Sequence, residues 1–165
     1  MANLILWRHA EAEAQSPSGA DIDRALTKRG FKDAAKMAKW LNQHLPENTE
    51  VLCSPALRCL QTVDELKSLN NVEIKIAEFL GVDHSVESIV KKINDNDVTQ
   101  TILLVGHQPN VGLLIAKLLG MNDTACVVKK GAVWWLRQRY TNEAQSKLAG
   151  ETPQTYLFMV QHPDY

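Results

Sequence analysis

The sequence is poor in cysteine, carries almost no net charge and has no long hydrophobic run. Its three cysteines are odd in number and form no Cys-x-x-Cys pair, which argues against a disulfide framework and favours small core residues in a reducing compartment. No apolar run reaches membrane-spanning length, and the first residues lack the pattern of a signal peptide. A formal net charge of −1 argues against general affinity for nucleic acids or acidic membranes. We therefore expect a cytoplasmic monomer with neither a nucleic-acid nor a membrane partner.

Several catalytic motifs are absent as well. The Walker A pattern is missing, which argues against a nucleoside triphosphatase, and so is the Gly-x-Ser-x-Gly elbow of serine hydrolases. No His-Glu-x-x-His or Cys-His spacing predicts a zinc site. No repeat, low-complexity segment or linker divides the 165 residues. We expect one domain over residues 1–165, with no metal and no other cofactor.

What the sequence does contain is an alternation of strand and helix patterns. Short apolar runs such as residues 101–105 are typical of strands that are buried on both faces. The expected strands cover residues 4–7, 50–53, 72–76, 101–105, 132–139 and 155–161. Helical spacing of apolar residues separates the first four of these strands and follows the fourth. The alternation predicts a three-layer α/β/α sandwich around a mostly parallel sheet.

Two helix starts carry specific signals. Thr27 is expected to cap a helix whose apolar face includes Phe31. Ser54 is expected to cap the next helix, with Pro55 at its first position. These assignments give Ser54 a structural explanation.

Arginine and histidine follow three of the expected strands. Arg8 and His9 end the first strand, Arg58 lies in the first turn of the helix after the second, and His107 comes just after residues 101–105. Because the carboxyl ends of parallel strands share one edge of a sheet, these side chains are expected to converge. Each one alone is more often structural or solvent-exposed. Arg58 also lies at a helix N-terminus, where a cation is disfavoured unless an anion is near.

Such a constellation suits phosphoryl transfer. Two guanidinium groups can chelate a tetrahedral dianion, and a neutral imidazole can attack phosphorus and carry the phosphoryl group in two steps. A second histidine can donate a hydrogen bond to the phosphoryl oxygens. Permanent cations beside the histidines would repel a divalent metal ion. Phosphate binding without turnover stays open on these residues alone.

The same residues lie in three motifs that resemble those of the histidine phosphatase superfamily. Arg8-His9-Ala10-Glu11 resembles its RHG signature, Ser54-Pro55-x-x-Arg58-x-x-Gln61-Thr62 its second motif, and Gly106-His107 its third. Asp21-x-x-Arg24-x-Leu26-Thr27-x-x-Gly30 is similar to a loop of the SixA-type phosphohistidine phosphatases. The resemblance implies a phosphoglycerate mutase-like fold.

The resemblance also implies roles for particular residues. His9 would be the nucleophile, with Arg8, Arg58 and His107 forming the phosphate pocket. Arg24 would add a phosphate or substrate contact, and we expect the same of Gln108. Ala10 departs from the family pattern, which has glycine there, and would be strained if its φ were positive.

The short segments between the motifs leave little material for a cap over the site. An open pocket fits a phosphohistidine on a protein surface better than an enclosed metabolite. We expect a metal-independent phosphatase that acts on phosphohistidine-bearing proteins. The alternatives are a small-molecule phosphomonoesterase or a phosphosugar mutase of the same superfamily, and a non-catalytic phosphoprotein-binding module. Asp21, Glu78 and Asp83 are candidate general acids by position.

Overall fold

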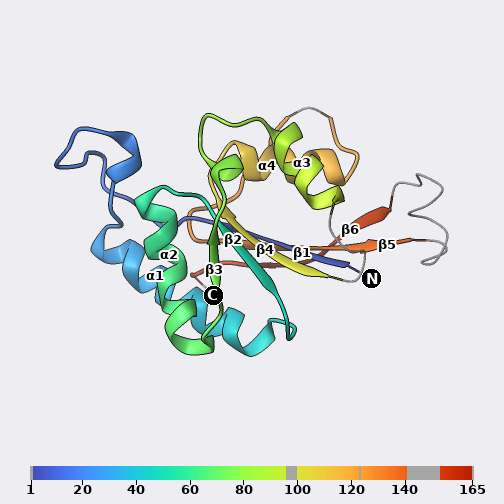
Figure 1. Ribbon diagram of the computed structural model, residues 1–165, viewed down its shortest axis with the longest axis horizontal. Coiled ribbons are helices and arrows are strands. Elements are labelled where there is room, and N and C mark those ends of the chain that lie inside the picture. The colour runs from blue at the N-terminus through green and yellow to red at the C-terminus, as the bar shows by residue number, and fades with distance from the viewer. Residues whose placement is uncertain (1, 96–99, 123, 141–152, 165) are drawn as a thin grey trace.

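The computed structural model describes residues 2–95, 100–122, 124–140 and 153–164. A six-stranded sheet with the order β3-β2-β4-β1-β5-β6 forms its centre (Figure 1). The strands are β1 (Ala2–Arg8), β2 (Glu50–Cys53), β3 (Ile74–Ile76), β4 (Thr101–Gly106), β5 (Val133–Arg139) and β6 (Gln154–Gln161). The α-helices are α1 (Lys28–His44), α2 (Leu57–Asn70), α3 (Val86–Asn94) and α4 (Asn110–Leu118). Short 3-10 helices lie at η1 (Asp21–Asp23) and η2 (Glu78–Leu80).

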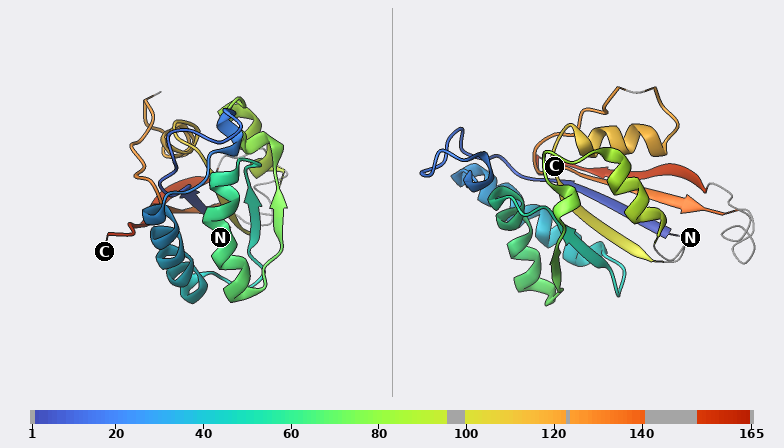
Figure 2. Two further views of the ribbon diagram at one scale, coloured as in Figure 1. Left: turned by 90° about the vertical axis from the view of Figure 1, so that its left-hand side faces the viewer. Right: turned by 45° about the horizontal axis from the view of Figure 1, so that its top comes forward.

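The sheet is parallel from β3 to β1, and β5 and β6 extend it antiparallel. Helices α1 and α2 cover one face, and α3 and α4 cover the other, as the two views of Figure 2 show. This confirms the predicted three-layer sandwich. Among the described residues, no helix has both the length and the apolar character needed to cross a bilayer.

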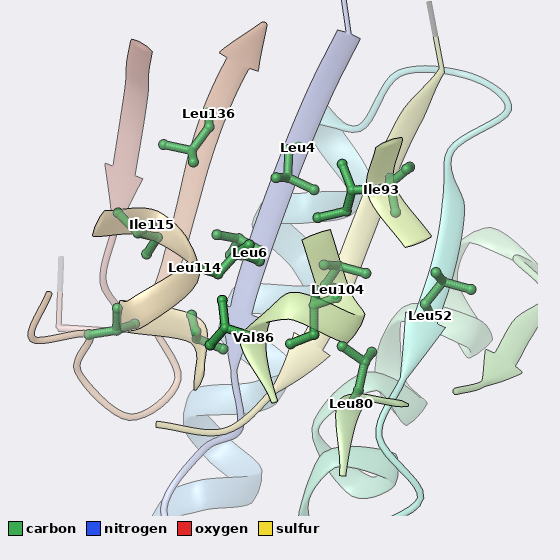
Figure 3. Close-up of a cluster of buried hydrophobic side chains, with 14 of the residues drawn as sticks. Leu4, Leu6, Leu52, Leu80, Val86, Ile93, Leu104, Leu114, Ile115 and Leu136 are labelled. Atoms are coloured by element: carbon green, nitrogen blue, oxygen red, sulfur yellow. The ribbon is translucent and has the colours of Figure 1, made fainter. Parts of the chain in front are cut away.

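Strand β1 shows why the centre is apolar on both sides. Leu4 and Leu6 pack in the cluster beneath α3 and α4 (Figure 3), while Ile5 and Trp7 pack beneath α1 and α2. Side chains alternate between the faces of a strand, so a strand covered on both faces needs apolar residues at every position. The helices therefore hold the strand that ends in Arg8 from both sides.

The register of β1 and β4 positions the site. Arg8 pairs with Gly106 across the parallel ladder, so His9 and His107 are the next residues of two adjacent strands. Cys53 of β2 pairs with Val105 on the other side of β4, which places Ser54 close to the same point. In Figure 1 the N-terminal label lies at the right-hand end of β1, so these carboxyl ends meet toward the left.

Local predictions are correct at Thr27 and wrong at two other positions. The Thr27 hydroxyl caps α1 by accepting from the Gly30 backbone N–H at 3.0 Å. Phe31 is 47% exposed and lies outside the buried face of α1, which includes Gly30 and Ala34. Helix α2 begins at Leu57 with Ala56 as its N-cap residue, so the predicted cap at Ser54 is wrong.

Candidate active site

Arg8, His9, Arg58 and His107 lie together at the carboxyl edge of the sheet. The rings of His9 and His107 have their centroids 5.3 Å apart and are tilted by 58°. His9 is 8% exposed, Arg58 4% and His107 3%. A buried arginine requires partners for its charge. The arrangement is therefore a buried cationic cluster built around two imidazoles.

His9 is held in one tautomer. Its Nδ1 lies 2.8 Å from the carbonyl oxygen of Ala10, which can only accept a hydrogen bond. The proton therefore sits on Nδ1, and Nε2 keeps its lone pair. Burial, and after it the charges of His107 and the two arginines, lower the pKa of His9 to about 3, although the hydrogen bond to Ala10 acts in the opposite direction. The ring is therefore neutral near pH 7. A neutral imidazole with a free Nε2 lone pair is a competent nucleophile.

The backbone of His9 is fixed on both sides. Its N–H donates to the Gly106 carbonyl at 3.1 Å, and its own carbonyl accepts from the Gly131 N–H at 3.1 Å. The next N–H, that of Ala10, donates to the Thr62 hydroxyl at 3.0 Å. The strand end is therefore tied to β4, to the segment before β5, and to α2.

The Arg8 guanidinium has one nitrogen with a backbone partner and one buried nitrogen without an acceptor among the described residues. Its Nη1 donates to the Val128 carbonyl at 2.7 Å, and its Nε is buried with no acceptor among the described residues. Burial lowers the pKa of Arg8 from its ordinary value. A buried N–H without an acceptor is costly, and an anion oxygen would provide one.

Arg58 and Arg24 are joined by Asp21. Arg58 donates from Nη1 to the Asp21 carbonyl at 2.8 Å and from Nη2 to the Asp21 carboxylate at 2.9 Å. Arg24 donates to the other carboxylate oxygen at 2.9 Å and, through Nε, to the Glu13 carbonyl. Arg24 is therefore linked to Arg58 through Asp21, and its contact with phosphate or substrate stays a prediction. The hydrogen bond from Arg24 lowers the pKa of Asp21; burial acts in the opposite direction, and the hydrogen bond and charge of Arg58 lower the pKa further.

His107 is neutral for the same reason as His9. Its Nε2 lies 2.7 Å from the Ser54 hydroxyl and 3.5 Å from the Cys59 sulfur. Burial, and after it the charge of Arg58, lower the pKa of His107 to about 4, although Asp21 acts in the opposite direction. Sequence reasoning misses Ser54 as a partner of His107 because a serine before Pro55 already has an explanation as a helix cap.

The side chain of Gln108 is engaged elsewhere. Its Nε2 donates to the Cys126 carbonyl at 2.6 Å, and its Oε1 accepts from the Gly112 N–H at 3.2 Å. The amide thus ties the start of α4 to the segment that precedes β5. A contact of Gln108 with substrate stays a prediction.

Ala10 fits without the strain that a positive φ would bring. The non-glycine residues with positive φ in the described part of the chain are Asn48 and Asn71. The Ala10 side chain is fully buried against Leu26 and Ala34. A methyl group is therefore accommodated where the family signature has glycine.

A cavity of about 220 Å³ lies beside this cluster. Its lining includes Asp21 and Ser54, whose contacts are described above, and also Glu78 and Asp83. Both of these carboxylates are exposed. Within the described ranges, no group of three or more His, Cys, Asp or Glu side chains is placed to hold a metal ion.

Comparison with known proteins identifies the family to which the chain is similar. Residues 4–81 match the sequence profile of the histidine phosphatase superfamily (branch 1). A phosphohistidine phosphatase SixA homolog of Haemophilus influenzae is 32% identical over 133 residues, covering 73% of this chain and 79% of that one. The phosphohistidine phosphatase SixA of Escherichia coli is 32% identical over 120 residues, covering 70% and 73%.

The fold is also that of a solved relative. The structure of the protein histidine phosphatase SixA complexed with tungstate superposes with a TM-score of 0.79 at 23% identity, covering 98% of this chain and 97% of that one. The motifs, the sequence relatives and the fold agree. The chain belongs to the histidine phosphatase superfamily and is a phosphatase.

Proposed function

We propose that this phosphatase removes the phosphoryl group from phosphohistidine in a protein, through a phosphorylated His9. The observation that carries the proposal is the state of His9, a buried neutral ring with its proton held by Ala10 and its Nε2 lone pair available. Arg8, Arg58 and His107 lie around that ring. A nucleophile set among fixed cations is the arrangement that phosphoryl transfer requires.

The reaction would proceed in two steps. Nε2 of His9 attacks phosphorus as the P–N bond of the substrate breaks. The substrate imidazole, protonated by solvent on its other ring nitrogen, leaves as the neutral ring. Water then attacks the phosphoryl group on His9, which restores the free imidazole and releases inorganic phosphate. In both steps Arg8 and Arg58 would neutralise charge on the phosphoryl oxygens.

Two observations support a protein substrate. The relatives from Haemophilus influenzae and Escherichia coli, which this chain matches over most of their length, are named phosphohistidine phosphatases. In addition, short segments such as η1 and η2 flank the carboxyl edge of the sheet in the described part of the chain. We infer that the chain acts as a single catalytic unit without a cap, on a phosphohistidine exposed at a protein surface.

Rapid quenching with a ³²P-labelled phosphohistidine protein tests the proposal. The enzyme should yield an acid-labile, alkali-stable phosphoenzyme with the label on His9. His9→Ala should abolish both the label and turnover, whereas His44→Ala, which removes an exposed histidine from the end of α1, should change neither. Label on another residue, or full turnover by His9→Ala, would refute the assignment.

A further inference from the structure

The hydroxyl of Ser54 forms a short hydrogen bond to a ring that the proposed reaction uses. Ser54 is fully buried, and its Oγ lies 2.7 Å from Nε2 of His107, which is itself 3% exposed. The serine follows β2 directly and the histidine follows β4 directly, so the register of the two strands sets this distance. The contact is therefore built by the sheet and does not depend on a flexible loop.

The surroundings decide which atom donates. The Ser54 Oγ already accepts from the Ala56 backbone N–H, at 3.4 Å, so its own proton is available. The imidazole nitrogen is a strong acceptor, whereas the sulfur of the neighbouring Cys59 is a weak one. If Nε2 carried the proton, the buried hydroxyl would be left with only that weak acceptor, which is unfavourable. The Ser54 hydroxyl therefore donates to Nε2.

We propose that Ser54 is a positioning residue that holds His107 in the tautomer with its proton on Nδ1. With Nε2 occupied as an acceptor, Nδ1–H becomes the donor that a neutral His107 can offer to a phosphoryl oxygen. This step rests on the proposed function, because it assumes that the phosphoryl group binds beside His9. The assignment of the tautomer itself does not.

The two histidines are then in the same tautomer and present opposite nitrogens. His9 donates its Nδ1 proton to the Ala10 carbonyl, and its Nε2 lone pair stays available for attack. His107 accepts from Ser54 at Nε2, and its Nδ1 proton stays available for donation. In the other tautomer, His107 would direct a lone pair toward the phosphoryl oxygens and repel them. A fixed tautomer at a catalytic histidine affects the rate strongly.

A cap on helix α2 does not account for Ser54. The N-cap residue of that helix is Ala56, and the 3.4 Å contact from its N–H is long for a hydrogen bond. Cys59 does not replace Ser54 either, because its thiol lies 3.5 Å from Nε2 and is a weak donor. The short contact to His107 is the strongest interaction of the Ser54 hydroxyl.

Long-range ¹H–¹⁵N correlation spectra of the ¹⁵N-labelled enzyme near pH 7 test the assignment directly. His107, identified by its loss in His107→Asn, should show a protonated Nδ1 and an unprotonated Nε2. In Ser54→Ala, His107 should no longer be confined to the tautomer with its proton on Nδ1. The kcat/KM of this variant on phosphohistidine should fall by about 10- to 100-fold, mostly in kcat. Ser54→Thr should retain the tautomer, and Ser85→Ala, at the N-cap of α3, should change neither measurement.

The spectrum separates this inference from the proposed function. A wild-type His107 with its proton on Nε2 overturns the role of Ser54 even if phosphohistidine is cleaved. An unchanged tautomer in Ser54→Ala overturns it as well. If the tautomer is as stated and depends on Ser54, the assignment is supported, and failure to turn over phosphohistidine then counts against the proposed substrate alone.

Discussion

At the scale of single residues, the site keeps two histidines neutral at acidic pH values where water would protonate them. His9 and His107 are neutral because burial and nearby arginines lower their pKa values to about 3 and about 4. A free histidine has a pKa near 6.5. The folded protein therefore excludes two protons that the unfolded chain would bind in mildly acidic solution.

This difference predicts how stability changes with pH. Well above about pH 6.5 the two rings are neutral in both the folded and the unfolded protein, so their burial does not reduce the free energy of unfolding. Below that pH the unfolded chain binds the protons first, so the free energy of unfolding should fall by about 1.4 kcal/mol per pH unit for each histidine. Urea unfolding at about pH 7.5, 6.5 and 5.5 measures the slope. His9→Asn should make the slope shallower, and a flat wild-type profile would contradict the pKa shifts.

Asp21 illustrates a residue whose role depends on its neighbours. Its position alone makes it a candidate general acid, but its carboxylate bridges Arg24 and Arg58, which lowers its pKa and keeps it ionised. An ionised carboxylate cannot donate a proton. Asp21 instead fixes the position of the Arg58 guanidinium, which donates to its carbonyl and carboxylate oxygens.

Asp21→Asn should therefore weaken phosphate binding and leave the leaving-group preference unchanged. Asp21 is 54% exposed, so the loss should be modest, about 3- to 10-fold in kcat/KM and mainly in KM. Asp23→Asn, in the same turn of η1, is the matched control and should have no effect. A loss confined to alkyl phosphates would instead identify Asp21 as the general acid.

The four central residues are predictable from the sequence because their positions follow from strand ends. Parallel strands share one carboxyl edge, so the strand pattern alone groups Arg8, His9, Arg58 and His107. Ser54 also follows a strand, but a serine before Pro55 is already explained as a helix cap, and its contact with His107 depends on the register between β2 and β4. The Val128 carbonyl is equally unpredictable, since backbone acceptors leave no sequence signal.

At the scale of elements, the residues after β1 are fixed by a close approach of α1. A Cβ at Gly30 would lie far inside the contact distance of the Glu11 backbone oxygen and close to the Leu26 side chain. The Thr27 N–H also donates to that Glu11 oxygen, at 3.0 Å. Glycine in the first turn of α1 therefore lets the helix rest directly on the segment that follows His9.

Gly30→Ala should separate these elements. Alanine favours a helix by about 1 kcal/mol, but overpacking costs about 1–3 kcal/mol and displaces the chain near His9. We expect a lower free energy of unfolding in urea and a lower kcat. Lys32→Ala, at an exposed position of the same helix, should change stability by less than about 0.5 kcal/mol. A Gly30→Ala enzyme with wild-type stability and rate would show that the close approach is unimportant.

Element boundaries are harder to predict than element types. The strand expected over residues 72–76 covers only Ile74–Ile76, and Ile76 is exposed at the edge of the sheet. Helix α2 begins at Leu57 because the preceding residues are extended and Ser54 is held by His107. Tertiary contacts decide both boundaries, and local sequence signals do not contain them.

At the scale of the whole molecule, the arrangement of carboxylates bears on which phosphates can be cleaved. Release of an alkoxide needs a general acid, a contribution of about 10²- to 10⁴-fold. The Asp21 carboxylate accepts hydrogen bonds from two arginines, and Glu78 and Asp83, which line the same cavity, are exposed. Phosphohistidine makes a smaller demand, because its P–N bond is labile and imidazole leaves readily once protonated.

We therefore predict an order of substrates: phosphohistidine first, activated aryl phosphates weakly, and alkyl phosphates such as phosphoserine barely. The measurement is kcat/KM for the three classes with the wild-type enzyme and with Glu78→Gln and Asp83→Asn. Both variants should leave phosphohistidine turnover within about twofold, because a surface charge change alone has a small effect. Comparable efficiency on alkyl phosphates, lost in one of the variants, would reveal a general acid and favour a broad phosphomonoesterase.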